Sequence, residues 1–194
     1  MVSNREYISD NPKFFDVIKK RRSIRKYKEF DIPDDDFAKI IDAARLAPSA
    51  ENSQPWRFLV VKDQEMKEIL AEAAGGQRFI SEANAVIVVL GLRSASCCPS
   101  NPARWYVQDP MIAAEHLVLA ATALGYGTCW VAMLETRPTR AIEIVKEMLE
   151  IPDDALLISL VTIGVPDETP LPRPRKDIQE IAFKERYGSP LIPR

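Results

Sequence analysis

The chain has 194 residues, with 26 basic and 28 acidic side chains, a formal net charge of -2 and an isoelectric point near 5.6. This balance argues against nucleic acid or an anionic membrane as the main partner, because both attract a clustered positive excess. No apolar run reaches the roughly 20 residues that span a bilayer, and the polar N-terminus lacks the apolar core of a signal peptide. We therefore expect a cytoplasmic protein with one domain over residues 1–194.

The cysteine and histidine content predicts no metal site. Cys97, Cys98 and Cys129 do not form a secreted disulfide framework and lack zinc-finger spacing. A redox role for the adjacent pair is disfavoured, because neighbouring cysteines make a strained bridge outside any Cys-x-x-Cys pattern. The single histidine, His116, lies in an apolar helical pattern that favours a core role over catalysis.

Helical spacing of apolar residues alternates with β-like runs along the chain. Asn11 and Pro12 are expected to start a first helix, with Asn11 as cap and Phe14, Phe15 and Ile18 as an apolar stripe. Later helices are predicted over residues 37–46, 66–73, 111–124 and 138–149, and strands over 57–62, 85–91 and 155–165. This interleaving predicts an α+β fold, a three-layer sandwich of a sheet between helices.

Two stretches around the longest helix carry weaker signals. Residues 92–107 lose periodicity and are interpreted as a long loop, either a pocket lid or an irregular cover, with Asp109 and Pro110 capping the helix that follows. That helix is apolar on more than one face, which is typical of a central or interfacial element. Gly125 and Gly127 follow a helix and lack the third glycine of a dinucleotide fingerprint, so they indicate a tight turn and a close backbone approach.

The connector over residues 48–58 has an unusual composition. Pro48 and Pro55 stiffen a loop that carries hydroxyl and amide side chains. Such groups suit the edge of a planar heteroaromatic ring, where they donate and accept hydrogen bonds. The alternative is that Ser49 and Asn52 only form turns with their own backbone.

Two dense basic clusters lie far apart in the chain. Residues 19–26 place six cations around Ser23, and residues 172–176 place three on a proline-stiffened backbone. Each is by default a solvated face or linker. A guanidinium fork beside a hydroxyl is also the composition that grips a phosphate, and both clusters together suit a single phosphate.

Four motifs occur in a fixed order along the chain: the basic cluster at 21–25, the loop at 47–56, the segment at 124–130 and the late Pro-Arg-Pro-Arg segment. Together they resemble the nitroreductase family of FMN flavoproteins. The resemblance covers residues 14–176, and the loop is its most specific part. It implies a central mixed or antiparallel sheet and an obligate, intertwined homodimer with two FMN molecules at the interface. The tail, residues 168–194, is then expected to contact the partner subunit.

The resemblance also assigns residues by position. The residues expected to bind the phosphate and ribityl end of FMN are Arg21, Ser23, Arg173 and Arg175. Arg22 and Arg25 are expected to lie between that end and the ring. The loop residues expected to reach the flavin from the other subunit are Pro48, Ser49, Ala50, Asn52 and Gln54. Gln77 is assigned to the pyrimidine edge, and the dimethylbenzene side or N5 to the backbone of Trp130, Val131 and Ala132. Larger bacterial members have Glu-Gly where this chain has Ala132 and Met133, so only a backbone contact is carried over.

The implied activity is oxidoreduction. NAD(P)H would deliver hydride to flavin N5, and a nitroaromatic, quinone or similar conjugated small molecule would collect it in ping-pong order, with no catalytic side chain. Glu51, Trp105 and Tyr106 are expected to line the substrate pocket, where the aromatic rings favour a flat acceptor. The alternatives are a dimeric flavin-binding protein with little turnover, or enoate reduction, dehalogenation or flavin fragmentation on the same fold.

Overall fold

The computed structural model describes residues 12–101, 103–134 and 137–191. The sheet has the order β1-β5-β3-β2, β4 also pairs with β5, and every strand pair is antiparallel. The strands are β1 (Tyr27–Lys28), β2 (Trp56–Val61), β3 (Ala85–Leu92), β4 (Gly127–Ala132) and β5 (Ala155–Pro166). The three predicted strands are confirmed as β2, β3 and β5. β1 and β4 were not predicted, because β1 is very short and β4 begins in a glycine-containing segment that indicates a turn.

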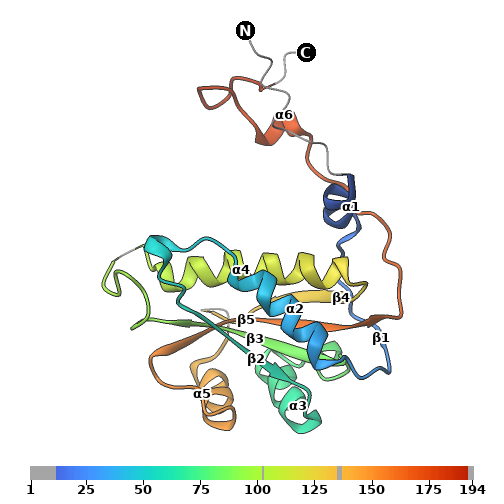
Figure 1. The fold of residues 1–194 in the computed structure, drawn as a ribbon, viewed down its shortest axis with the longest axis vertical. Coiled ribbons are helices and arrows are strands. Elements are labelled where there is room, and N and C mark those ends of the chain that lie inside the picture. Colours follow the sequence, from blue (N-terminus) through green and yellow to red (C-terminus); the bar gives the residue numbers. More distant parts are fainter. Residues whose placement is uncertain (1–11, 102, 135–136, 192–194) are drawn as a thin grey trace.

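Helices cover both faces of this sheet, as Figure 1 shows. α2 (Asp34–Arg45) and α4 (Trp105–Ala123) pack on one face, and α3 (Gln64–Ala73) and α5 (Thr139–Met148) on the other. The side chains of β3 alternate between two cores, with Ile87 facing α2 and α4 and Val88 facing α3 and α5. The predicted α+β three-layer sandwich is confirmed.

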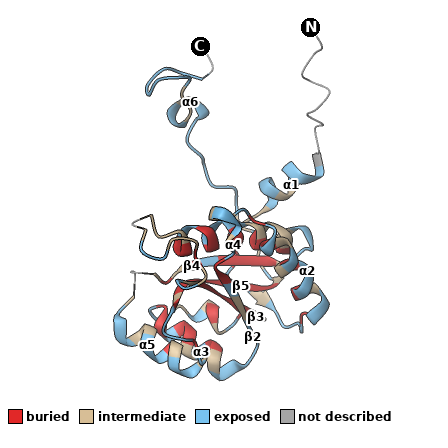
Figure 2. Cartoon of the chain, turned by 60° about the vertical axis from the view of Figure 1, so that its left-hand side comes forward, coloured by how far each residue is buried: buried red, intermediate tan, exposed pale blue. Residues whose placement is uncertain are grey.

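Two segments stand away from the three layers (Figures 1 and 2). α1 (Pro12–Lys20) exposes the predicted stripe of Phe14, Phe15 and Ile18, and the tail after β5 exposes Leu171 and, in α6 (Ile178–Ile181), Ile181. The expected Asn11 cap lies outside the described residues. Apolar side chains left in solvent by a single chain indicate surfaces that another element covers.

The start of α4 differs from the prediction. The helix begins at Trp105, so the irregular segment ends at residue 104, and Asp109 and Pro110 lie inside the helix instead of capping it. Pro110 has no N–H, so the carbonyl of Tyr106, four residues earlier, lacks its helical hydrogen-bond partner. That carbonyl oxygen instead faces β3, and a Cβ added to Gly91 would lie 1.8 Å from it. Glycine at position 91 permits this close approach. No helix in the described part of the chain, α4 included, is long and apolar enough to cross a membrane.

Candidate functional site

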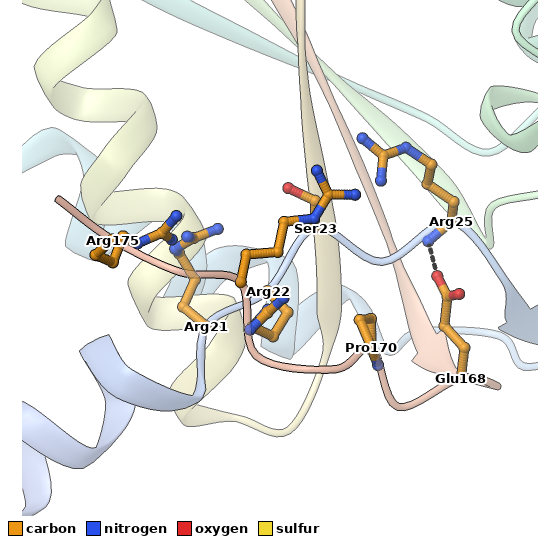
Figure 3. A pocket seen from close by; sticks show the side chains of 8 residues that line it. Arg21, Arg22, Ser23, Arg25, Glu168, Pro170 and Arg175 are labelled. Atoms are coloured by element: carbon orange, nitrogen blue, oxygen red, sulfur yellow. Dashed lines mark hydrogen bonds between the residues drawn. The ribbon is translucent and has the colours of Figure 1, made fainter.

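The two basic clusters meet in one cavity of about 360 Å³. Its lining residues come from the segment after α1 and from the tail after β5 (Figure 3), and are Arg21, Arg22, Ser23, Arg25, Glu168, Pro170, Arg173 and Arg175. Six of these residues were predicted from sequence to share a site. Glu168 and Pro170 were not, because a glutamate among arginines gives no signal in sequence.

Strand β4 fixes the first basic segment. Ser23 forms a parallel bridge with Thr128, and the N–H of Ile24 donates to the Thr128 carbonyl at 2.9 Å. A Cβ on Gly127 would stand 2.7 Å from the Ile24 side chain, and Gly125 turns the chain with φ +90°. The predicted close approach and tight turn are therefore confirmed at these two glycines.

The tail is tied to the same segment. Arg22 donates a side-chain hydrogen bond to the Leu171 carbonyl, and a Glu168 carboxylate oxygen accepts from the backbone N–H groups of Arg25 and Lys26. The Asp167 N–H donates to the Lys26 carbonyl at 2.9 Å. The Glu168 carboxylate thus accepts hydrogen bonds from backbone N–H groups and, among the described residues, forms no ion pair with the arginines that line the cavity with it (Figure 3).

The cavity carries a strong positive charge, with five arginines against one glutamate. None of the ion pairs found among the described residues involves these five arginines. Burial raises the pKa of the neighbouring Cys129 thiol, and this rise is opposed by the charge of Arg25 and a hydrogen bond with Ser23. Guanidinium groups without ion-pair partners, gathered around a serine hydroxyl, have the composition that suits a multiply charged anion such as a phosphate monoester.

The loop before β2 is held in an unusual backbone conformation. Glu51, Asn52 and Gln54 all have left-handed φ angles, of 50°, 56° and 48°. Such strain is concentrated at functional sites. The local-turn interpretation is also correct in part, because the Ser49 hydroxyl accepts from the Gln54 N–H at 3.0 Å and the Asn52 side chain accepts from the Gln54 amide at 3.2 Å.

A buried carboxylate supports this loop from α4. The N–H of Ala50 donates to Asp109 at 3.2 Å, and burial raises the pKa of that carboxyl. Pro48, Glu51, Asn52 and Gln54 remain exposed above it. This role of Asp109 was not predicted from sequence, since the residue matches a helix cap.

The loop does not line the arginine cavity of its own chain. Gln77 lies two residues from Phe79, and the Phe79 ring centroid is 5.5 Å from the guanidinium carbon of Arg25. The Gln77 side-chain amide, however, donates to the nearby Ala74 carbonyl. β4 runs onward from its bridge with Ser23, with Trp130 exposed, Val131 buried and Ala132 half-buried. Neither Gln77 nor any of these three β4 residues lines the cavity.

The aromatic residues and His116 occupy other places. Tyr106 is buried at the start of α4 and lines a second cavity of about 450 Å³, where Arg93 hydrogen-bonds its hydroxyl at 3.3 Å and lowers its pKa. Trp105 beside it is half-buried. His116 is only half-buried, so the prediction of a core position was wrong. Its Nδ1 lies 3.3 Å from the Ala43 carbonyl oxygen of α2, and its side chain lines an apolar groove with Phe14 of α1.

Known proteins with similar sequences belong to one family. The nitroreductase family model matches residues 18–92 and 71–165. A protein of Archaeoglobus fulgidus, named as an inferred NADH dehydrogenase/NAD(P)H nitroreductase, is 38% identical over 152 residues, which cover 78% of this chain and 84% of its own. The NADH dehydrogenase of Thermus thermophilus is 31% identical over an alignment 194 positions long, which covers 84% of this chain and 92% of the Thermus protein.

A solved structure extends the agreement to the fold. The FMN-dependent nitroreductase of Clostridium difficile has a TM-score of 0.75 and 30% identity, over 88% of this chain and 98% of that one. The family match, these relatives and the shared three-layer architecture lead to one conclusion. The chain belongs to the nitroreductase family.

Proposed function

We propose that this NAD(P)H-dependent oxidoreductase of the nitroreductase family uses FMN, held by its phosphate in the arginine cavity. The observation that carries the proposal is the convergence of two distant basic segments on one cavity. A related structure is named FMN-dependent, which is the same cofactor. Bound FMN would supply hydride transfer between NAD(P)H and an acceptor.

The residues of the cavity divide into two groups along its length. Arg21 and Arg175 lie at one end in Figure 3, with Arg173 in the same lining, and this end suits the phosphate. Arg25 lies at the other end, over the Phe79 ring. There its fixed charge would favour the negative charge that reduction places on the flavin.

The proposal includes a homodimer. Phe14 and Phe15 of α1, Leu46 after α2, and Met111 and Ile112 of α4 are all exposed large apolar residues. The cavity between α1 and α4, about 320 Å³, is mostly apolar as well. A second copy covering this face would bury these residues and would bring the loop at 48–54 to the arginine cavity of its partner, with the tail at 168–194 wrapped across the interface.

The acceptor is proposed to be a conjugated small molecule, such as a nitroaromatic or a quinone, that takes electrons in ping-pong order. The chain then needs to position two flat molecules in turn and exclude water, with no side-chain acid or base in the reaction. A cytoplasmic location completes the proposal.

The visible spectrum of the purified protein tests it. We expect flavin absorption bands that bleach under anaerobic NADH or NADPH and return when a quinone or nitroaromatic is added. Bands that persist under both nicotinamides would identify a flavin-binding protein with little turnover. A colourless protein that FMN cannot reconstitute would overturn the cofactor assignment.

A further inference from the structure

Two cysteines and a carboxylate lie together away from the arginine cavity. Cys97 and Cys98 belong to the segment between β3 and α4, and Glu51 belongs to the strained loop before β2. Their two Sγ atoms and a carboxylate oxygen all lie within 4.8 Å of one another. The sequence gives no sign of this cluster, because Glu51 is distant from both cysteines along the chain.

Backbone contacts on both sides hold the cluster in place. The turn that carries the cysteines is closed by the Ser96 N–H donating to the Arg93 carbonyl at 3.1 Å and the Asn101 N–H donating to the Cys98 carbonyl at 3.0 Å. The Ser94 N–H donates to the Asp154 carboxylate, at 3.1 Å and 3.2 Å to its two oxygens. Glu51 has a left-handed φ of 50°, which re-aims its side chain, and the preceding Ala50 is fixed to Asp109.

The surroundings favour a cation. The cluster places one carboxylate against two sulfur atoms, so its ligand set is negatively charged once the thiols lose their protons. The cysteines are half-buried, so a charge between them is partly shielded from water. A bound cation would offset the repulsion between two thiolates and the nearby carboxylates.

We propose that Glu51, Cys97 and Cys98 form a binding site for one thiophilic divalent cation of the Zn²⁺ type. Two thiolates and a carboxylate match the ligands that Zn²⁺ takes, and sulfur ligands disfavour Mg²⁺ and Ca²⁺. Tetrahedral Zn–S bonds of about 2.3 Å separate two sulfurs by roughly 3.8 Å, so the side chains need to close only slightly. Each thiol that binds releases its proton to solvent, and the fourth position is left to water.

Such an ion would join the segment at 93–104 to the loop at 48–54. The loop carries Ser49, Ala50 and Asn52, which are proposed to reach the flavin, so metal binding would restrain residues next to that site. The inference itself needs no flavin, because its three ligands come from this chain. It therefore stands or falls separately from the proposed function.

Cd²⁺ is the probe, since thiolate ligation gives it a charge-transfer band in the ultraviolet. The full chain, reduced and freed of metal by a chelator, is titrated with Cd²⁺ and then with competing Zn²⁺. We expect one ion per chain, displacement of Cd²⁺ by Zn²⁺, and loss of the band in the double variant Cys97→Ser/Cys98→Ser. Cys129→Ser is the matched control, because that thiol is buried elsewhere, and it should keep the band.

Glu51→Gln tests whether the carboxylate takes part in metal binding or whether the two adjacent thiols bind the metal without it. Glu51 is exposed, so this variant is expected to fold, which circular dichroism checks. Its Cd²⁺ affinity should fall at least about tenfold, as losses of supporting groups at metal sites do. Unchanged affinity in Glu51→Gln, a band that survives in the double serine variant, or one ion shared by two chains would each overturn the proposal.

Discussion

Arg22 donates a side-chain hydrogen bond to the carbonyl oxygen of Leu171, across 149 positions of sequence. This contact joins the segment after α1 to the tail after β5, the two segments that supply the arginines. The cavity therefore exists only when the segment at 21–25 and the tail after β5 are folded against each other.

Arg21→Ala should weaken FMN binding. Removing one charged partner of the phosphate costs about 1.5 to 3 kcal/mol, which corresponds to a rise in Kd of about tenfold to a hundredfold. Fluorescence titration of the apoprotein with FMN measures the change. Arg140→Ala is the control, because Arg140 lies on α5, exposed and paired with Glu143, and should keep wild-type affinity. Arg21→Ala protein that stays fully yellow at low FMN would remove Arg21 from the site.

Arg25→Ala should make the bound flavin harder to reduce. Loss of a cation worth about 1.5 to 3 kcal/mol to the reduced ring lowers the two-electron potential by about 30 to 60 mV. A dye-coupled spectroscopic titration of flavin-loaded protein measures the potential, again against Arg140→Ala. An unchanged potential with weakened FMN binding would instead assign Arg25 to the phosphate.

Mixed dimers test whether the site is shared. Arg21→Ala and Asn52→Ala homodimers should each bind FMN weakly. If the arginines and the loop come from different subunits, a heterodimer of the two variants combines both defects in one site and leaves the other site intact. Differently tagged chains allow the heterodimer to be purified and its tight FMN sites to be counted. No tight site in the heterodimer would place Arg21 and Asn52 in the same chain's site.

Ile112→Asp should separate the proposed homodimer into monomers that bind FMN poorly. Burying an isoleucine contributes about 1.5 to 3 kcal/mol, and a buried, unpaired aspartate reverses that gain in both subunits. Light scattering after gel filtration measures the mass. Met148→Asp is a close control, since Ile112 and Met148 are both 42% exposed but Met148 lies on α5, across the sheet. Dimers in Ile112→Asp, or monomers in the wild type, would contradict this interface.

Asp109→Asn should flatten the pH dependence of stability. Burial raises the pKa of this carboxyl above its ordinary value of 3.8, so the folded state holds its proton to higher pH than the unfolded state does. The free energy of unfolding therefore falls as pH rises through the window between 3.8 and the raised value. Asparagine does not titrate and still offers an oxygen to Ala50. Urea unfolding at several pH values measures the slope, and an equal slope in variant and wild type would rule out this contribution.

Much of the fold could be predicted because its signals are local. The continuous apolar run of β3 is typical of a strand buried on both faces, and the stripes of α2 and α3 follow from helical spacing; these elements are present as predicted. The start of α4 was missed because Asp109 and Pro110 match a helix cap, and only the packing of Gly91 against Tyr106 shows that the helix begins earlier.

By itself the sequence determined the chemistry available to this protein: two arginine segments, a loop stiffened by Pro48 and Pro55, and small glycines at the turn before β4. Only the tertiary structure decided which of these groups meet. The pairing of β4 with β5 sets Ser23 beside Thr128 and sends the tail past Arg22, and the start of α4 sets Asp109 under Ala50. Those contacts depend on strand order and long-range packing, which no local pattern of residues specifies.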